Sequence, residues 1–165
     1  MVAKLSLGTK LSMQNYSPVD LASEVGTSIL PAANGGTARA TYQDRMILLA
    51  SKIGANMNSS ADQVLTMASG LTKYIIRRIT VTNASVNLTT AAGGFYTAAS
   101  KGGTTVVANT QVYSALTAST KFVDLTLAAG VTADVVTAAL LYLSLTTPQG
   151  VAATADVYVF GEDLS

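Results

Sequence analysis

The sequence predicts a mainly β protein, an antiparallel β-sandwich preceded by an N-terminal arm that carries short helices. Beyond about residue 61, short apolar runs alternate with polar residues, and clusters of Gly, Asn and Thr separate these runs as turns do. Before residue 60 the pattern is different, because short helix signals alternate with loop-like stretches. We therefore expect an extended arm over residues 1–60 and a β-sandwich domain over residues 61–165.

The expected arm contains two helix-capping signals. Ser17 precedes a proline at the first helical position, and an acidic residue follows three positions after the cap, which predicts a short helix over about 18–25. Thr41 begins a similar pattern ahead of the apolar run RMILLASKI at 45–53. Apolar residues of this run would share one face of a helix, but the same run also suits a buried strand. Both interpretations of the run stay open.

Eight strands are expected in the sandwich domain. Their approximate ranges are 63–67, 74–82, 94–99, 104–108, 111–116, 122–127, 138–146 and 155–160. Alternation is clearest in FVDLTL, LLYLSL and ADVYVFG, where aliphatic residues occupy every second position, as an antiparallel sheet with one buried face requires. Eight short strands without long helices between them predict two packed sheets. A jelly roll is the favoured topology, and an immunoglobulin-like sandwich is the alternative.

The clearest turn signal is the run SKGG at 100–103, which lies between two of the expected strands. Glycine adopts a positive φ with little strain, and a tight hairpin turn needs positive φ values. We therefore expect a β-hairpin here, with Gly102 and Gly103 supplying the positive φ.

The residue types that most often carry enzyme chemistry are missing. The 165 residues include no His, Cys or Trp, and charged residues make up 12% of the chain. Without His, no side chain titrates near neutral pH at its usual pKa, and without Cys there is neither a thiolate nucleophile nor a soft metal ligand. We therefore expect a protein without enzymatic activity, cofactor or bound metal.

The composition also indicates the kind of partner. Soluble proteins carry about 25% charged residues, so a chain with 12% and a mean hydropathy of +0.40 is expected to lose surface to neighbouring subunits. A net charge of +1 argues against a general electrostatic grip on nucleic acid. No apolar run approaches the roughly 18 residues of a membrane helix. The sequence favours a building block of an assembly that binds neither nucleic acid nor membrane.

One segment, KYIIRR at 73–78, concentrates basic and apolar residues. On a regular strand Tyr74, Ile76 and Arg78 would share one face, with Arg77 on the other, so each face would mix apolar and basic groups. Such a mixture suits a strand at a sheet edge or at a contact between protomers. The predicted interface residues lie in or near this segment and the 45–53 run: Arg39, Arg45, Met46, Ile47, Leu48, Leu49, Arg77 and Arg78.

Several stretches resemble small virion proteins of tailed bacteriophages, over roughly residues 50–165. They are TVTNASVNLTTAAGGFYTAASKGGTTVVA at 80–108, YSALT at 113–117, LYLSLTT at 141–147 and ADVYVFGEDLS at 155–165. The resemblance implies a jelly-roll-like cement or decoration protein on the capsid surface, or a structural protein of the tail.

The leading hypothesis is therefore a non-enzymatic capsid cement protein of the virion. Its partner would be the major capsid protein, the sandwich would self-associate as a trimer, and the arm would cover seams between coat subunits. One alternative is a tail or baseplate structural protein. Another is a glycan-binding β-sandwich module, although such modules commonly bind sugars through Trp, which this chain lacks.

Overall fold

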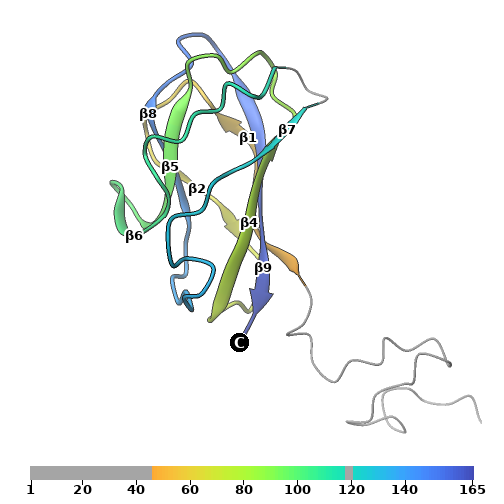
Figure 1. The fold of residues 1–165 in the computed structure, drawn as a ribbon, viewed down its shortest axis with the longest axis vertical. Coiled ribbons are helices and arrows are strands. Elements are labelled where there is room, and N and C mark those ends of the chain that lie inside the picture. The colour runs from red at the N-terminus through yellow and green to blue at the C-terminus, as the bar shows by residue number, and fades with distance from the viewer. Residues whose placement is uncertain (1–45, 118–120) are drawn as a thin grey trace, which may run out of the picture. The chain divides into compact units, whose positions relative to one another are not determined.

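The computed structural model describes residues 46–117 and 121–165, all of which belong to one compact unit, Gln43–Ser165. The regular secondary structure of these residues consists of nine β-strands, arranged in two antiparallel sheets that pack as a β-sandwich (Figure 1). The strands are β1 (Ile47–Asn56), β2 (Gln63–Val64), β3 (Thr66–Met67), β4 (Tyr74–Thr82), β5 (Ala92–Ala98), β6 (Gly102–Val107), β7 (Phe122–Asp124), β8 (Tyr142–Thr147) and β9 (Thr154–Asp163). The predicted antiparallel sandwich is confirmed.

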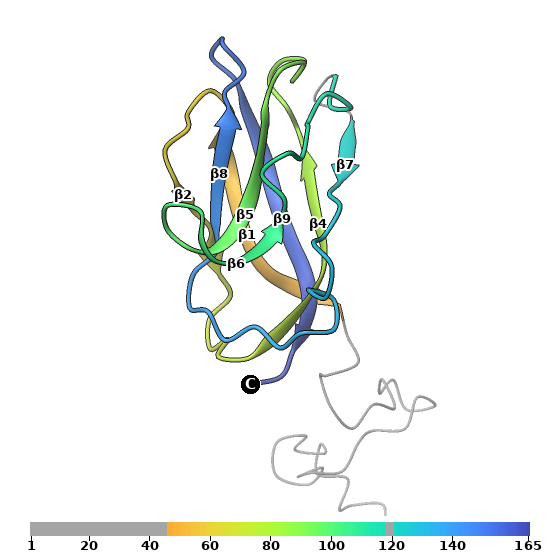
Figure 2. The ribbon, with the colours of Figure 1, turned by 60° about the vertical axis from the view of Figure 1, so that its left-hand side comes forward.

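The strand order follows a nested pattern. The five-stranded sheet has the order β3-β1-β9-β4-β7 and the four-stranded sheet the order β2-β8-β5-β6. β1 pairs with β9, β2 with β8, β4 with β7 and β5 with β6, so the first strand meets the last and each later pair lies inside the one before. Successive pairs alternate between the two sheets, and Figure 2 shows β1, β9, β4 and β7 side by side in one of them.

The expected alternation is confirmed where it was clearest. Leu143 and Leu145 of β8 and Val157 and Val159 of β9 are fully buried, whereas Tyr158 between the two valines is partly exposed. These aliphatic side chains meet between the sheets and form one continuous core. Along β8 and β9 the core therefore takes an aliphatic side chain from every second residue.

The expected domain boundary at residue 60 is wrong, because the sandwich begins with β1 at Ile47. β1 lies between β3 and β9 in the five-stranded sheet and buries Leu49 in the core, so the 45–53 run contains a strand. Two register shifts, between Leu48 and Ala50 and between Lys52 and Ala55, break the period of two along β1. Because of these bulges, the sequence of the run lacks the regular alternation that predicts a strand. The expected helix over 18–25 lies outside the described residues.

The expected strand over 111–116 is also wrong. The chain turns at both ends of this segment, because the Gln111 N–H donates to the Ala108 carbonyl at 3.1 Å and the Leu116 N–H to the Tyr113 carbonyl at 2.9 Å. Only a single bridge, between Val112 and Ala92, joins the segment to β5. Local turns therefore replace a strand of useful length here.

The predicted hairpin joins β5 to β6, but its turn is built differently from the prediction. The residues with positive φ at its centre are Ser100 (57°) and Lys101 (59°), followed by Gly103 (69°). The Gly102 N–H donates to the Ala99 carbonyl at 3.0 Å and closes the turn. Positive φ at both central positions is the geometry of a type I′ turn, which matches the twist of paired strands.

Candidate interaction surface

The edges of both sheets offer little backbone to another chain. Of the four edge strands, β2 and β3 have two residues each and β7 has three. β6 is longer, but two register shifts interrupt its pairing with β5. Short and bulged edges are how sheet proteins avoid strand addition. Addition of a strand from another chain at these edges is therefore disfavoured.

The outer side of the four-stranded sheet is covered by the chain itself. Its side chains Tyr96 and Ser144 are 3% and 1% exposed, although they point away from the core residues on either side of them. A Cβ atom at Gly94, which pairs with Ser144, would lie 2.2 Å from the Val107 carbonyl oxygen. We call this side, defined by Gly94, Tyr96 and Ser144, the covered face.

The opposite side of the molecule, the outer side of the five-stranded sheet, is more open. Its residues alternate with buried residues of β1, β4, β7 and β9, and we call them the open face: Leu48, Ser51, Arg78, Thr80, Phe122, Asp124, Tyr158 and Phe160. Leu48 is 43% exposed and Phe122 is 66% exposed. Large apolar side chains left in solvent on one side of a sheet are typical of an interaction surface.

An aromatic strip runs along the centre of the open face. Phe160 on β9 pairs with Leu48 of β1 on one side and with Arg78 of β4 on the other. The Arg78 guanidinium carbon lies 4.9 Å from the centroid of the Phe160 ring, and the Tyr158 ring stacks on the same strand with its centroid 6.4 Å away. A cation held over an aromatic ring contributes about 0.5–1 kcal/mol at an exposed site. The strip is therefore partly ordered before any partner binds.

Polar groups flank this strip on the side of β7. The Asp124 carboxylate accepts a hydrogen bond from the Thr80 hydroxyl and lies 4.0 Å from Nε of Arg78. Both charged side chains are close to half exposed, so their pairing contributes little to folding stability. Arg78 and Asp124 therefore remain accessible to a charged partner.

Arg77, which was also predicted to lie in the interface, makes its polar contacts within the chain. Its Nε lies 2.8 Å from Oε1 of Glu162, and its Nη1 donates to the Thr132 carbonyl. A register shift between Ile76 and Arg78 places Arg77 in a β-bulge. The predicted mixture of basic and apolar groups on each face of β4 is therefore wrong: the bulge turns Ile76 and Ile79 both inward and leaves both arginines in solvent.

The structure brings part of the predicted interface together. Leu48 and Arg78, which are thirty positions apart in the sequence, lie on either side of Phe160. Met46 is exposed just ahead of β1, but Ile47 is partly buried against the core and Leu49 is fully buried, so Leu49 is not a surface contact. Arg39 and Arg45 lie outside the described residues.

Of the eight members of the open face, the sequence predicted only Leu48 and Arg78, and the most prominent of those it missed are Tyr158, Phe160, Phe122 and Asp124. The signal for them was present, because the alternation in ADVYVFG and FVDLTL separates these residues from the buried valines. The alternation does not give the order of the strands. That order decides whether another part of the chain covers the side opposite the core.

Within the described residues no three acidic or metal-binding side chains gather closely enough to hold a metal ion. The three acids near the C-terminus have separate partners. Asp156 accepts from the Gly54 N–H at 2.8 Å and from Asn83, Glu162 pairs with an arginine, and Asp163 accepts from the Ser165 N–H. No helix in residues 46–117 and 121–165 is long and apolar enough to cross a membrane.

Comparison of the chain with known proteins finds no matching family model, no similar curated protein and no similar solved structure.

Proposed function

We propose that this protein is a structural component of a tailed-phage virion, a cement or decoration protein that binds the head shell and stabilises it. The observation that carries the proposal is the open face, with an ordered aromatic strip at its centre, on a domain whose sheet edges are too short or too irregular for strand addition. The low content of charged residues and the resemblance of residues 50–165 to small phage virion proteins support the same function.

We also assign the sandwich to the jelly-roll topology. A jelly roll is a long antiparallel hairpin folded over so that its nested strand pairs fall alternately into two sheets. The four nested pairs, from β1 with β9 to β5 with β6, support this assignment, and β3 is then an addition beside β1. Jelly rolls are common among viral capsid domains, but the topology also occurs in lectins, so it supports a virion role without deciding it.

In this proposal the open face packs against a subunit of the major capsid protein. Four strands about 4.8 Å apart, with up to ten residues each at about 3.3 Å per residue, span on the order of 500 Å². A stable interface between two proteins needs about 800 Å² from each partner. A second contact is therefore required, and we assign it to Met46 and the chain before it, with Arg39 and Arg45 proposed from the sequence alone.

Self-association of the sandwich as a trimer on the capsid surface completes the proposal. Three copies joined at a symmetry axis of the shell would bind with three open faces at once. Linked binding events strengthen one another without any new contact, so moderate affinity at each face is sufficient. The expected location is the outer surface of the virion head.

The test uses purified phage heads that lack this protein, to which the full-length chain is added. We expect co-sedimentation with the heads and a higher temperature of head disruption. Phe122→Ser should weaken binding at least tenfold, because Phe122 is the most exposed large side chain of the open face. Val151→Ser is the matched control, since Val151 is similarly exposed in the turn between β8 and β9. Binding to isolated tails instead of heads would favour a tail or baseplate component and would refute the cement role.

A further inference from the structure

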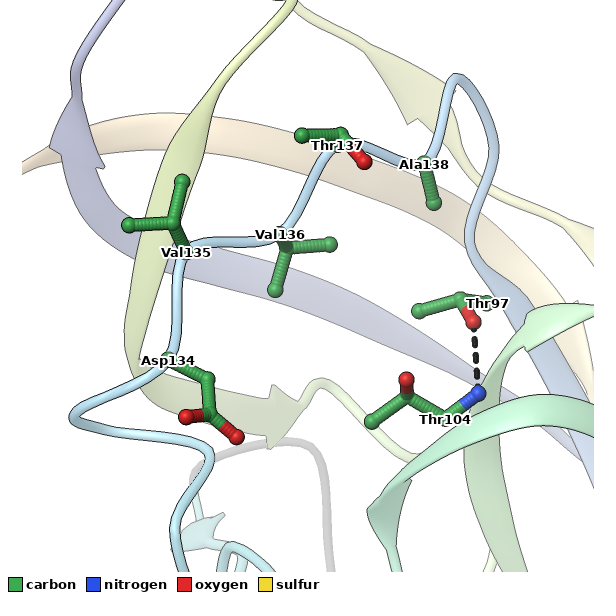
Figure 3. A pocket seen from close by; sticks show the side chains of 7 residues that line it. All are labelled: Thr97, Thr104, Asp134, Val135, Val136, Thr137 and Ala138. Carbon is green, nitrogen blue, oxygen red and sulfur yellow. Dashed lines mark hydrogen bonds between the residues drawn. The ribbon is translucent and has the colours of Figure 1, made fainter.

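A polar hollow of about 360 Å³ lies between the β5–β6 hairpin and the segment that follows the turn at 130–134. Figure 3 shows its lining, with the Asp134 carboxylate and the Thr104 side chain on opposite sides of the hollow. Its walls combine a carboxylate, threonine hydroxyls and two valines: Thr97, Thr104, Asp134, Val135, Val136 and Thr137. This hollow involves none of the residues of the open face.

Each wall of the hollow is held in place by its own hydrogen bonds. Val136 exchanges two backbone hydrogen bonds with Tyr74, at 3.0 and 2.8 Å, and the Tyr74 hydroxyl donates to the Ala138 carbonyl at 2.8 Å. On the hairpin side, the Thr104 N–H donates to the Thr97 hydroxyl at 2.8 Å. The site is therefore largely formed before a ligand arrives, as small-molecule sites usually are.

The groups that remain for a ligand are the Asp134 carboxylate and the hydroxyls of Thr104 and Thr137. None of the three makes a hydrogen bond through these atoms to another described residue. The Asp134 N–H donates to the Gly130 carbonyl at 3.0 Å, which fixes the backbone and leaves the carboxylate at the rim of the hollow. The site thus offers a strong acceptor opposite a hydroxyl that both donates and accepts.

The lining excludes several classes of ligand. No basic side chain lines the hollow, so an anion would meet only the repulsion of Asp134. A single carboxylate with neutral hydroxyls is too few charged oxygens for tight binding of calcium. The lining contains no aromatic ring on which a nucleobase could stack. What fits is a neutral molecule that is rich in hydroxyl groups and has an apolar face.

We propose that this hollow binds a neutral sugar residue. The Asp134 carboxylate accepts hydrogen bonds from two neighbouring sugar hydroxyls, Thr104 and Thr137 exchange hydrogen bonds with others, and Val136, whose methyl groups point into the hollow in Figure 3, packs against the C–H face of the ring. The volume lies at the lower end of the about 300–1,000 Å³ of small-molecule sites, which suits one sugar residue. With so few charged contacts, we expect a dissociation constant of about 1 mM. This inference does not rest on the virion function.

The test is NMR titration of the full-length, isotope-labelled chain with glucose, galactose, mannose and N-acetylglucosamine in turn. We expect at least one of them to shift the amide signals of Thr104, Val135 and Thr137 together. Asp134→Asn should weaken that binding about tenfold, because the amide accepts more weakly than the carboxylate. Asp124→Asn is the matched control: it removes one exposed carboxylate from the distant open face and should leave the titration unchanged.

Thr104→Val is a second variant, which keeps the shape of the side chain and should also weaken binding. No shift with any of the four sugars, or equal binding by the wild type and Asp134→Asn, would overturn the proposal. Shifts produced by free arginine but by no sugar would also overturn it and would indicate a basic protein side chain as the occupant. Binding is measured on the free protein, so its outcome is separate from the binding to phage heads.

Discussion

On the four-stranded sheet the chain covers its own outer side, whereas on the five-stranded sheet Leu48 and Phe122 stay exposed. Both sheets place aromatic residues on the side opposite the core, yet Tyr96 of the covered face is 3% exposed while Phe160 of the open face is only partly buried. At Gly94 on the covered face, the backbone of Val107 at the end of β6 and of Ala108 just after it lies 2.2–2.9 Å from where a Cβ atom would be, so no side chain fits there.

The comparison shows that two similar alternating strands can have different roles. A side chain on the outer side of a sheet contributes to folding where another part of the chain packs over it. Where no other part of the chain packs over it, the side chain is free to bind a partner. Substitutions on the covered face and on the open face distinguish these two roles through their effects on folding stability.

The largest effect is expected from Gly94→Ala on the covered face. The new Cβ would lie 2.2 Å from the Val107 carbonyl oxygen and 2.9 Å from the Ala108 carbonyl carbon, both backbone atoms that move only if β5 and β6 separate. We expect a loss of about 3 kcal/mol in the free energy of unfolding. Urea denaturation measures it, with Ser51→Ala on the open face as the control, for which a change within about 0.5 kcal/mol is expected. Equal free energies of unfolding for Gly94→Ala and Ser51→Ala would show that no backbone packs closely against Gly94 on the covered face.

Alkaline pH should destabilise the domain through its buried tyrosines. Burial raises the pKa of the Tyr74 hydroxyl to about 12 and also raises the pKa values of Tyr113 and Tyr96. A phenol with a higher pKa in the folded than in the unfolded state stabilises the fold fully below the unfolded pKa of about 10, and this contribution is lost as the pH rises towards the folded value. Stability measured by denaturation should therefore fall above pH 10. A constant stability between pH 10 and 12 would contradict this burial.

A smaller folding effect is expected from Phe160→Ala on the open face. The ring is only partly buried, and its removal takes away contacts with Leu48, Tyr158 and Arg78, which together contribute about 1 kcal/mol. Phe95→Ala in the core should cost about 3–5 kcal/mol by contrast. Thermal unfolding compares the two variants. A loss as large for Phe160 as for Phe95 would show that the aromatic strip serves folding.

The smallest effect is expected from Ser144→Ala on the covered face. The Ser144 hydroxyl is buried and makes no hydrogen bond within the described residues, so its removal should leave stability unchanged or raise it by about 1 kcal/mol. The hydrogen bond from the Ser100 N–H lowers the pKa of Asp62, and a hydrogen bond from the Ser144 hydroxyl would lower it further. A loss of stability in Ser144→Ala, together with a higher pKa of Asp62 measured by NMR, would show that this hydrogen bond forms.

The sandwich could be predicted from the sequence because alternation and turn signals are local. Apolar residues two positions apart predict strands β8 and β9, and adjacent turn-forming residues predict the hairpin at 100–103. The sequence does not decide between a helix and a strand for β1 and places it in the arm, and it misassigns the faces of β4, because both strands contain bulges. A bulge depends on the partner strand, which a local pattern does not contain.

The candidate surface was predictable only in part for a related reason. Leu48 and Arg78 could be selected from their chemistry, since an apolar run and a basic run stand out in a chain with few charges. Phe160, which joins them, could not be, because its position between β1 and β4 is set by the pairing of the last strand with the first. That pairing spans more than one hundred residues of the sequence.

The most direct test of the proposed role is a cryo-EM reconstruction of the phage particle that carries this protein. We expect density for the sandwich on the outer surface of the head, with the open face against a coat subunit and the rings of Phe122 and Phe160 buried in the contact. The covered face should then point away from the shell. A sandwich found on the tail, or one bound to the head with Phe122 and Phe160 in solvent, would contradict the account.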